Sequence, residues 1–289
     1  MTYLATPEGV IFLVLASAIL HAAWNTLVKS GGGDRLTFMI VFAGIQTVVT
    51  FPLLFVVDYP GHDALAYAVG SSIIHCGYFS LVYLAYKMAD MSQVYPISRG
   101  LAPALVAVLA WIWLDDQLAG MQWLGLGLVS ASILSLAAPA LVNFRRSQET
   151  ARGVGFALLN GLVITSYLLV DGQGVRIATT PISYIVWVFF LMPMVFLLLC
   201  MKWQKSWAWE VFKPQLVLGS LGGIVSIVSY ALALFAMSLQ PLGPIVALRE
   251  TSVIFGAVFA TLFLKEAFGL RRVFAAVGVF IGLYFLKIF

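Results

Sequence analysis

Ten apolar segments, each long enough to cross a lipid bilayer, constrain this chain more than any other feature of its sequence. A helix needs about 20 apolar residues to cross the hydrocarbon core, whereas a transmembrane β-strand needs only about 9–11. The polar breaks between the segments are short and leave no room for a soluble domain. The sequence therefore predicts an all-α, polytopic membrane protein. We expect transmembrane helices over residues 9–28, 36–57, 64–87, 93–114, 121–142, 153–171, 181–202, 214–238, 243–264 and 270–288.

The composition excludes several classes of protein. Hydrophobic residues make up 62% of the 289 residues and charged residues only 10%, against roughly 45–50% and about 25% in soluble domains. Water-soluble enzymes, nucleic-acid-binding domains and disordered chains are excluded, so the lipid bilayer is an expected partner and nucleic acid is not. Both cysteines, Cys76 and Cys200, lie in apolar segments, which argues against disulfides and zinc. No nucleophile motif, phosphate-binding loop or metal-ligand spacing is present, so we expect no enzyme, no catalytic residues, no metal and no cofactor.

The positive charges predict an orientation. Most Lys and Arg residues lie in the loops that follow the first, third, fifth, seventh and ninth segments. Short cytoplasmic loops are enriched in Lys and Arg. We therefore expect these loops in the cytoplasm and both termini outside, with Arg176 and Lys287 on the external side.

An internal repeat relates the two halves of the chain. Residues 84–116 align without a gap with residues 234–266, which places Arg99 on Arg249 and Asp116 on Glu266. Each half holds five segments, an odd number, so the second half must insert upside down. We expect two inverted five-helix repeats, residues 1–145 and 152–289. Such repeats are typical of secondary transporters, which bind substrate near the midplane and work by alternating access.

Four charged residues fall within or at the ends of spans. A charge at the bilayer centre costs about 2.5–3.5 kcal/mol, so Arg99 and Arg249 are expected to face the interior, near the two mouths of a cavity, and to attract an anion. The alternatives are snorkelling to the headgroups, or structural bonds to carbonyls at broken helix ends. Glu250 could carry a proton or pair with Arg99, and both interpretations stay open. Asp171, followed by Gly172-Gln173-Gly174, is expected to end its helix in water.

Other polar, aromatic and proline residues suggest a cavity. Pro96 and Pro103 are expected to break the helix over 93–114 and to expose backbone groups there. His21 and His75 are expected to be buried with satisfied hydrogen bonds. Small residues spaced four apart, Gly219 with Gly223 and Gly278 with Gly282, predict close helix packing. For the aromatic and amide side chains, lining a cavity and packing between helices are both open; they are Trp24, Asn25, Tyr78, Tyr95, Tyr167 and Tyr230.

Two motifs resemble the EamA-type members of the drug/metabolite transporter superfamily. They are residues 21–29 (HAAWNTLVK) and residues 94–100 (VYPISRG), with Asp116 after the span and a second copy in residues 167–174 and 247–266. The resemblance implies a secondary carrier, often an exporter of amino acids or other small metabolites, with a cavity between two EamA-like repeats. Carried over by position, the implied substrate contacts are Trp24, Asn25, Tyr95, Ser98, Arg99, Tyr167, Arg249 and Glu250.

The sequence and the resemblance together predict a multi-pass transporter of the plasma (inner) membrane. Its expected substrate is a small polar metabolite such as an amino acid or carboxylate, with protons as a second candidate partner. One chain contains both halves, so a monomer could suffice. A flippase for a lipid-linked substrate and a membrane subunit without transport activity remain as alternatives.

Overall fold

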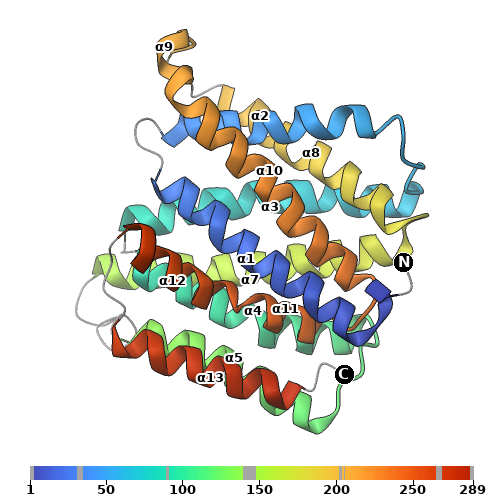
Figure 1. The fold of residues 1–289 in the computed structure, drawn as a ribbon, viewed down its shortest axis with the longest axis vertical. Helices are drawn as coiled ribbons and strands as arrows, with labels where there is room; N and C mark the ends of the chain where they lie inside the picture. The colour runs from blue at the N-terminus through green and yellow to red at the C-terminus, as the bar shows by residue number, and fades with distance from the viewer. Residues whose placement is uncertain are drawn as a thin grey trace.

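The computed structural model describes residues 3–30, 35–88, 91–138, 148–201, 204, 206–264 and 269–286. Within these residues the regular structure is helical throughout (Figure 1). The first half contains η1 (Tyr3–Ala5), α1 (Pro7–Ser30), α2 (Arg35–Leu53), α3 (His62–Met88), α4 (Met91–Trp113) and α5 (Gly120–Leu136). The second half contains α7 (Gln148–Ile177), α8 (Pro181–Met201), α9 (Trp209–Phe212), η2 (Lys213–Gln215), α10 (Leu216–Met237), α11 (Leu242–Arg249), α12 (Ser252–Leu264) and α13 (Leu270–Leu286).

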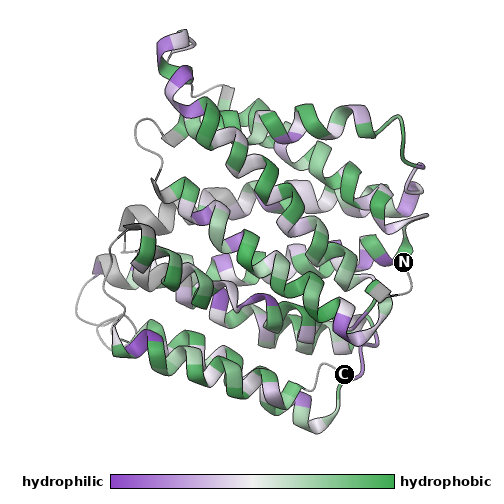
Figure 2. Ribbon diagram, in the orientation of Figure 1, coloured by the Kyte–Doolittle hydropathy of each residue, from purple (hydrophilic) through white to green (hydrophobic). Residues whose placement is uncertain are grey.

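Each predicted apolar segment coincides with a helix, and the segment over 243–264 forms two, α11 and α12. Within the described residues, seven segments are long and apolar enough to span a membrane. Large apolar side chains such as Phe55 and Phe274 are 77% and 72% exposed, whereas Arg99 and Asp171 are only 4% and 0% exposed. Hydrophobic residues run along most of the helix length, as Figure 2 shows. The chain is therefore an all-helical, multi-pass membrane protein.

The helices pack in pairs that join the two halves of the chain. In the first half α1 packs against α10, α11 and α12, while α2 packs against α8 and α10. Helix α3 packs against α7 and α8, and α4 against α7 and α11. At one edge α5 packs against α13 (Figure 1). The beginning of α1 and the end of α13 lie at the same end of the bundle.

Glycines allow two of these pairs to approach closely. A Cβ at Gly282 on α13 would lie 2.8 Å from the carbonyl oxygen of Gly125 on α5. A Cβ at Gly223 on α10 would lie 2.6 Å from the carbonyl oxygen of Phe42 on α2. Small residues let helix backbones meet in a membrane, where packing drives association. The close packing predicted from these glycine pairs is confirmed.

The helix break falls where the sequence did not predict it. Pro96 and Pro103 lie inside the continuous helix α4, so the predicted break there is wrong. The chain instead leaves α-helical geometry at Glu250 and Thr251, between α11 and α12. The Thr251 hydroxyl donates to the Leu248 carbonyl at 2.8 Å, and the Thr251 amide donates to the same carbonyl at 3.1 Å. A hydroxyl that bonds a nearby carbonyl competes with the helical ladder and favours such a tightened turn.

Candidate functional site

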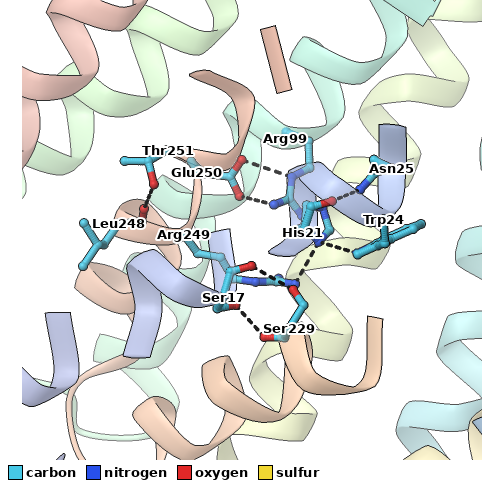
Figure 3. Close-up of polar contacts among 10 residues, drawn as sticks. All are labelled: Ser17, His21, Trp24, Asn25, Arg99, Ser229, Leu248, Arg249, Glu250 and Thr251. Atoms are coloured by element: carbon cyan, nitrogen blue, oxygen red, sulfur yellow. Dashed lines mark hydrogen bonds and ion pairs between the residues drawn. The ribbon is translucent and has the colours of Figure 1, made fainter. Parts of the chain in front are cut away.

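Arg99 and Glu250 form a buried ion pair in the middle of the bundle (Figure 3). Arg99 on α4 donates from Nε to Glu250 Oε2 at 3.0 Å, and its Nη2 lies 2.8 Å from Oε1. The two side chains are 5% and 1% exposed. Two parallel contacts fit the fork of a guanidinium to a carboxylate. Of the roles left open for Glu250, pairing with Arg99 is the arrangement observed.

Arg249 lies in the same cluster but meets no carboxylate within the described residues. Its Nη2 is 3.2 Å from Nδ1 of His21 on α1, and its guanidinium lies over the Tyr230 ring of α10, 5.0 Å from the centroid. The side chain is buried, and its Nε has no hydrogen-bond partner in the part of the chain that the structure describes. The expectation that the two arginines sit near opposite mouths is wrong. They converge because α4 and α11 contact each other.

His21 organises the part of the cluster that α1 supplies. Its Nδ1 accepts from Arg249 and also from Trp24 Nε1, 3.3 Å away (Figure 3). Both neighbours can only donate, so Nδ1 is unprotonated and the neutral ring carries its proton on Nε2. The Asn25 side chain donates to the His21 carbonyl at 2.8 Å. Trp24 and Asn25 are half-buried beside the arginines, and both bond back to their own helix.

An aromatic group lies next to Arg249. The His75 ring of α3 stacks on Tyr167 of α7 with centroids 4.1 Å apart, and Tyr167 meets Tyr230 edge to face at 6.3 Å. His75 Nδ1 lies 2.9 Å from the Ser71 carbonyl, so it is the donor there. Both histidines are buried with polar partners, as expected. The rings of Tyr167 and Tyr230 give the cluster an apolar wall with polar tips.

The structure adds Asp171 to the candidate residues. The prediction that it ends a helix in water is wrong, because it lies inside α7 and is fully buried. Its Oδ1 accepts from the Tyr184 hydroxyl at 2.8 Å and its Oδ2 from the Tyr230 hydroxyl at 2.6 Å. The sequence spacing could have indicated this position, because Asp171 follows Tyr167 by four residues and therefore lies on the same helix face.

One sequence-predicted contact, Ser98, stands apart from the cluster, and a second, Tyr95, is not placed. Ser98 is buried, but its hydroxyl donates to the Ala157 carbonyl at 2.9 Å and so joins α4 to α7. The side chain of Tyr95 lies outside the described residues. The structure therefore brings together Trp24, Asn25, Arg99, Tyr167, Arg249 and Glu250.

A polar knot joins four chain segments at the end of the bundle where α4, α7 and α10 finish. Arg176 and Asp116 pair in a forked contact, Nη1 to Oδ1 at 2.8 Å and Nη2 to Oδ2 at 3.2 Å. Arg176 also donates to the carbonyls of Met237 at 3.0 Å and Gln240 at 2.8 Å. The Leu242 amide donates to Asp116 at 2.7 Å. A left-handed residue, Asp115 at φ 54°, turns the chain into this position.

The family model of the EamA-like transporters matches residues 9–138. This part of the chain is thus similar to the EamA-like transporter family, which is part of the drug/metabolite transporter superfamily. The match confirms the resemblance drawn from the motifs at residues 21–29 and 94–100; the motifs of the second half lie beyond it. None of the curated proteins compared with the sequence matches it. Among solved structures, 29 chains match. One crystal structure, described only as that of a protein, has a TM-score of 0.74 at 15% identity over 98% of each chain, which shows a shared fold.

The EamA-like region supplies only part of the charged cluster. Arg99, Trp24 and Asn25 lie within it, whereas Tyr167, Arg249 and Glu250 lie beyond it. Contacts of α4 with α11 and of α1 with α10 bring the two sets together. Within the described residues no group of three His, Cys, Asp or Glu side chains could hold a metal ion.

Proposed function

We propose that this EamA-like chain is a secondary transporter that binds a small carboxylate-bearing metabolite, such as an amino acid, at Arg249. The observation that carries the proposal is the buried guanidinium of Arg249, which pairs with no carboxylate and whose Nε has no hydrogen-bond partner within the described residues. Its side-chain contacts are His21 and Tyr230. A buried charge without a paired counter-charge is costly in a membrane. A bound carboxylate would offset that cost with a charge-assisted hydrogen bond.

The helix break beside Arg249 supports an anion site. Helix α12 begins at Ser252, three residues after Arg249, and spans 13 residues. The positive end of a helix attracts anions, and broken helices in transporters use it for substrate carboxylates. Ser252 is buried, and its hydroxyl has no hydrogen-bond partner among the residues that the structure describes. Arg249 ends α11 and Ser252 begins α12, so each side of the break carries one donor without a partner.

The pairing of helices supports the proposal of two inverted repeats, residues 1–145 and 152–289, with ten spans. The contact of α3 with α7 has a counterpart in that of α10 with α1, and α3 with α8 has one in α10 with α2. Likewise α4 on α7 corresponds to α11 and α12 on α1. The pairs α2–α8, α4–α11 and α5–α13 each join an element to its own counterpart. A two-fold relation between the halves produces this pattern.

The polar knot supports alternating access. Asp116 and Arg176 hold the ends of α4, α7 and α10 together with the start of α11. A carrier must close one end of its pathway while the other is open, and such a knot can be the closure. The distribution of Lys and Arg predicts that this end faces outward. Export across the plasma membrane is the direction implied by the family resemblance, and we retain it within the proposal.

The test is solute flux in proteoliposomes made with the full chain. The panel contains radiolabelled L-serine, L-aspartate, pyruvate and succinate, and the variants are Arg249→Gln and the matched control Arg271→Gln at an exposed position on α13. We expect saturable flux of at least one solute, retained in the control and lost in Arg249→Gln. Equal flux in Arg249→Gln would remove the proposed anion site.

A wild type without any flux would refute the transport of small carboxylates. The flippase alternative then has its own readout, the movement of a fluorescent lipid across the same vesicles. Lipid movement without solute flux would indicate that the protein moves lipid-linked substrates. The absence of both lipid movement and solute flux would indicate a subunit without transport activity.

A further inference from the structure

Asp171 is a buried carboxylate that the proposed anion site does not use. It lies in α7 with no exposed surface. Each carboxylate oxygen accepts one phenolic hydroxyl, from Tyr184 on α8 at 2.8 Å and from Tyr230 on α10 at 2.6 Å. Within the described residues, no basic side chain comes within ion-pair distance of it. Glu250 differs in this respect, because it is paired with Arg99.

The local sequence makes room for this arrangement. Gly174 lies almost one helical turn beyond Asp171, and a Cβ there would come within 2.6 Å of the Tyr184 hydroxyl oxygen. Only glycine lets the Tyr184 ring pass against α7 and reach the carboxylate. The residues that suggested a loop, Gly172-Gln173-Gly174, therefore serve helix packing around a buried acid.

We propose that Asp171 is the proton-binding site of the carrier, ionised in one state of the transport cycle and protonated in the other. A carboxylate in a dry interior must be compensated by a cation or take up a proton. Within the described residues no cation contacts the carboxylate directly, since Arg249 meets the Tyr230 ring and not Asp171, so a proton can take the place of a paired cation. The titratable and charged groups around Asp171 are His75 on α3, Tyr167 on α7, Tyr184 on α8, Tyr230 on α10 and, beyond Tyr230, Arg249 on α11.

Tyr230 links the proton site to the proposed anion site. Its hydroxyl bonds Asp171, and its ring lies under the Arg249 guanidinium. A change of charge on Asp171 therefore reaches Arg249 through one side chain. Tyr230 and Arg249 are both buried, so the charges act on each other through a medium of lower dielectric constant than water.

The charge balance of the cluster predicts the stoichiometry. With neutral histidines, Arg99, Arg249, Glu250 and Asp171 sum to zero when both carboxylates are ionised. A monoanion at Arg249 adds one negative charge, and one proton on Asp171 restores neutrality. We therefore expect one proton to be taken up from solution with each bound monoanion and released with it on the other side. This coupling step rests on the proposed function, whereas proton binding at Asp171 does not.

The first experiment tests proton binding alone. Infrared difference spectra between acid and alkaline pH are recorded for the full chain in lipid vesicles, with Asp171→Asn and Glu250→Gln as the matched pair. The wild type should show a titrating carboxylic-acid carbonyl band that Glu250→Gln retains and Asp171→Asn loses. A band retained in Asp171→Asn, or lost only in Glu250→Gln, would overturn the proposal.

A second variant distinguishes the loss of the band through misfolding from the loss of the Asp171 carboxyl group. Tyr184→Phe keeps the carboxylate but removes one of its two hydrogen bonds. The carbonyl band should therefore shift in frequency in this variant while remaining present. A band unchanged by Tyr184→Phe would not belong to Asp171 and would also overturn the proposal.

The second experiment tests coupling with the panel of labelled solutes. Asp171→Asn should keep exchange of labelled for unlabelled solute, because exchange needs no net proton movement. Its accumulation driven by a pH gradient should fall to the equilibrium level. Undiminished gradient-driven accumulation, or accumulation driven by sodium and lost in Asp171→Asn, would refute proton coupling at this residue. If the wild type moves no solute, the transport proposal fails while the infrared result still decides the site.

Discussion

Removing one partner of the Arg99–Glu250 pair should cost more stability than removing both. The contacts of 3.0 and 2.8 Å join side chains that are only 5% and 1% exposed. Breaking a buried pair leaves an uncompensated charge and costs about 3–5 kcal/mol, whereas apolar replacement of both partners is often close to neutral. We therefore expect Arg99→Met and Glu250→Leu each to destabilise the protein, and the double variant to regain most of the loss.

Thermal unfolding in lipid nanodiscs, followed by tryptophan fluorescence, measures this difference. The chain has 8 tryptophans as reporters. In chains of 150–250 residues, 1 kcal/mol shifts Tm by about 2–4 °C. Each single variant, at about 3–5 kcal/mol, should then lower Tm by about 6–20 °C. The coupling energy from the double-mutant cycle should exceed about 3–5 kcal/mol, the cost of either single variant, because only then is the double variant more stable than each single one.

Arg249→Met is the matched control, since it removes an arginine that pairs with no carboxylate within the described residues. Its Tm should stay unchanged or rise, while transport is lost, because a binding group is held at a cost in stability. Equal losses in all three single variants, with the double variant at the sum of its parts, would refute the pairing argument.

Three further predictions follow from other contacts. Arg176→Gln should weaken the closed end by about 1–3 kcal/mol and raise maleimide labelling of an Ile245→Cys reporter, in a Cys76→Ser/Cys200→Ser background, by roughly 5–140-fold; unchanged labelling would show that the contacts of Arg176 do not close this end. Gly174→Ala should destabilise by about 1–3 kcal/mol, measured by Tm against Gly155→Ala, where a Cβ meets nothing within 4 Å; equal Tm values would contradict the packing argument. Ser17→Ala should cost about 1 kcal/mol by removing one of the reciprocal Ser17–Ser229 bonds of 2.6 and 2.8 Å, and Ser229→Ala should cost a similar amount in the same assay.

The helices could be predicted from the sequence because a membrane imposes length and polarity together. In lipid, an apolar run of about 20 residues can pair all of its backbone N–H and C=O groups within the segment only as a helix. For the same reason the inward placement of Arg99 and Arg249 followed from their charge alone. Both conclusions depend on the solvent and not on which helices meet.

The location of Asp171 could not be predicted because glycine can either end a helix or allow close packing within one. Gly172-Gln173-Gly174 after an acidic residue is typical of a helix end, where glycine adopts unusual backbone angles. Here Gly172 and Gly174 remain helical, and they face the Leu242 side chain and the Tyr184 ring. The choice between these uses is made by neighbours distant in sequence. The same limit applies to the break at Thr251, which a hydroxyl produces without a proline.

The two arginines, equivalent in the repeat, differ because only one half carries the glutamate. The alignment that places Arg99 on Arg249 places Gly100 on Glu250. A Cβ at Gly100 would lie 2.8 Å from the Leu134 side chain and 3.0 Å from its backbone nitrogen, so the packing of α4 on α5 excludes a glutamate there. Glu250 pairs with Arg99 across the halves. Arg249 is left without a paired carboxylate within the described residues, and this asymmetry is the reason for proposing it as the residue that binds a substrate carboxylate.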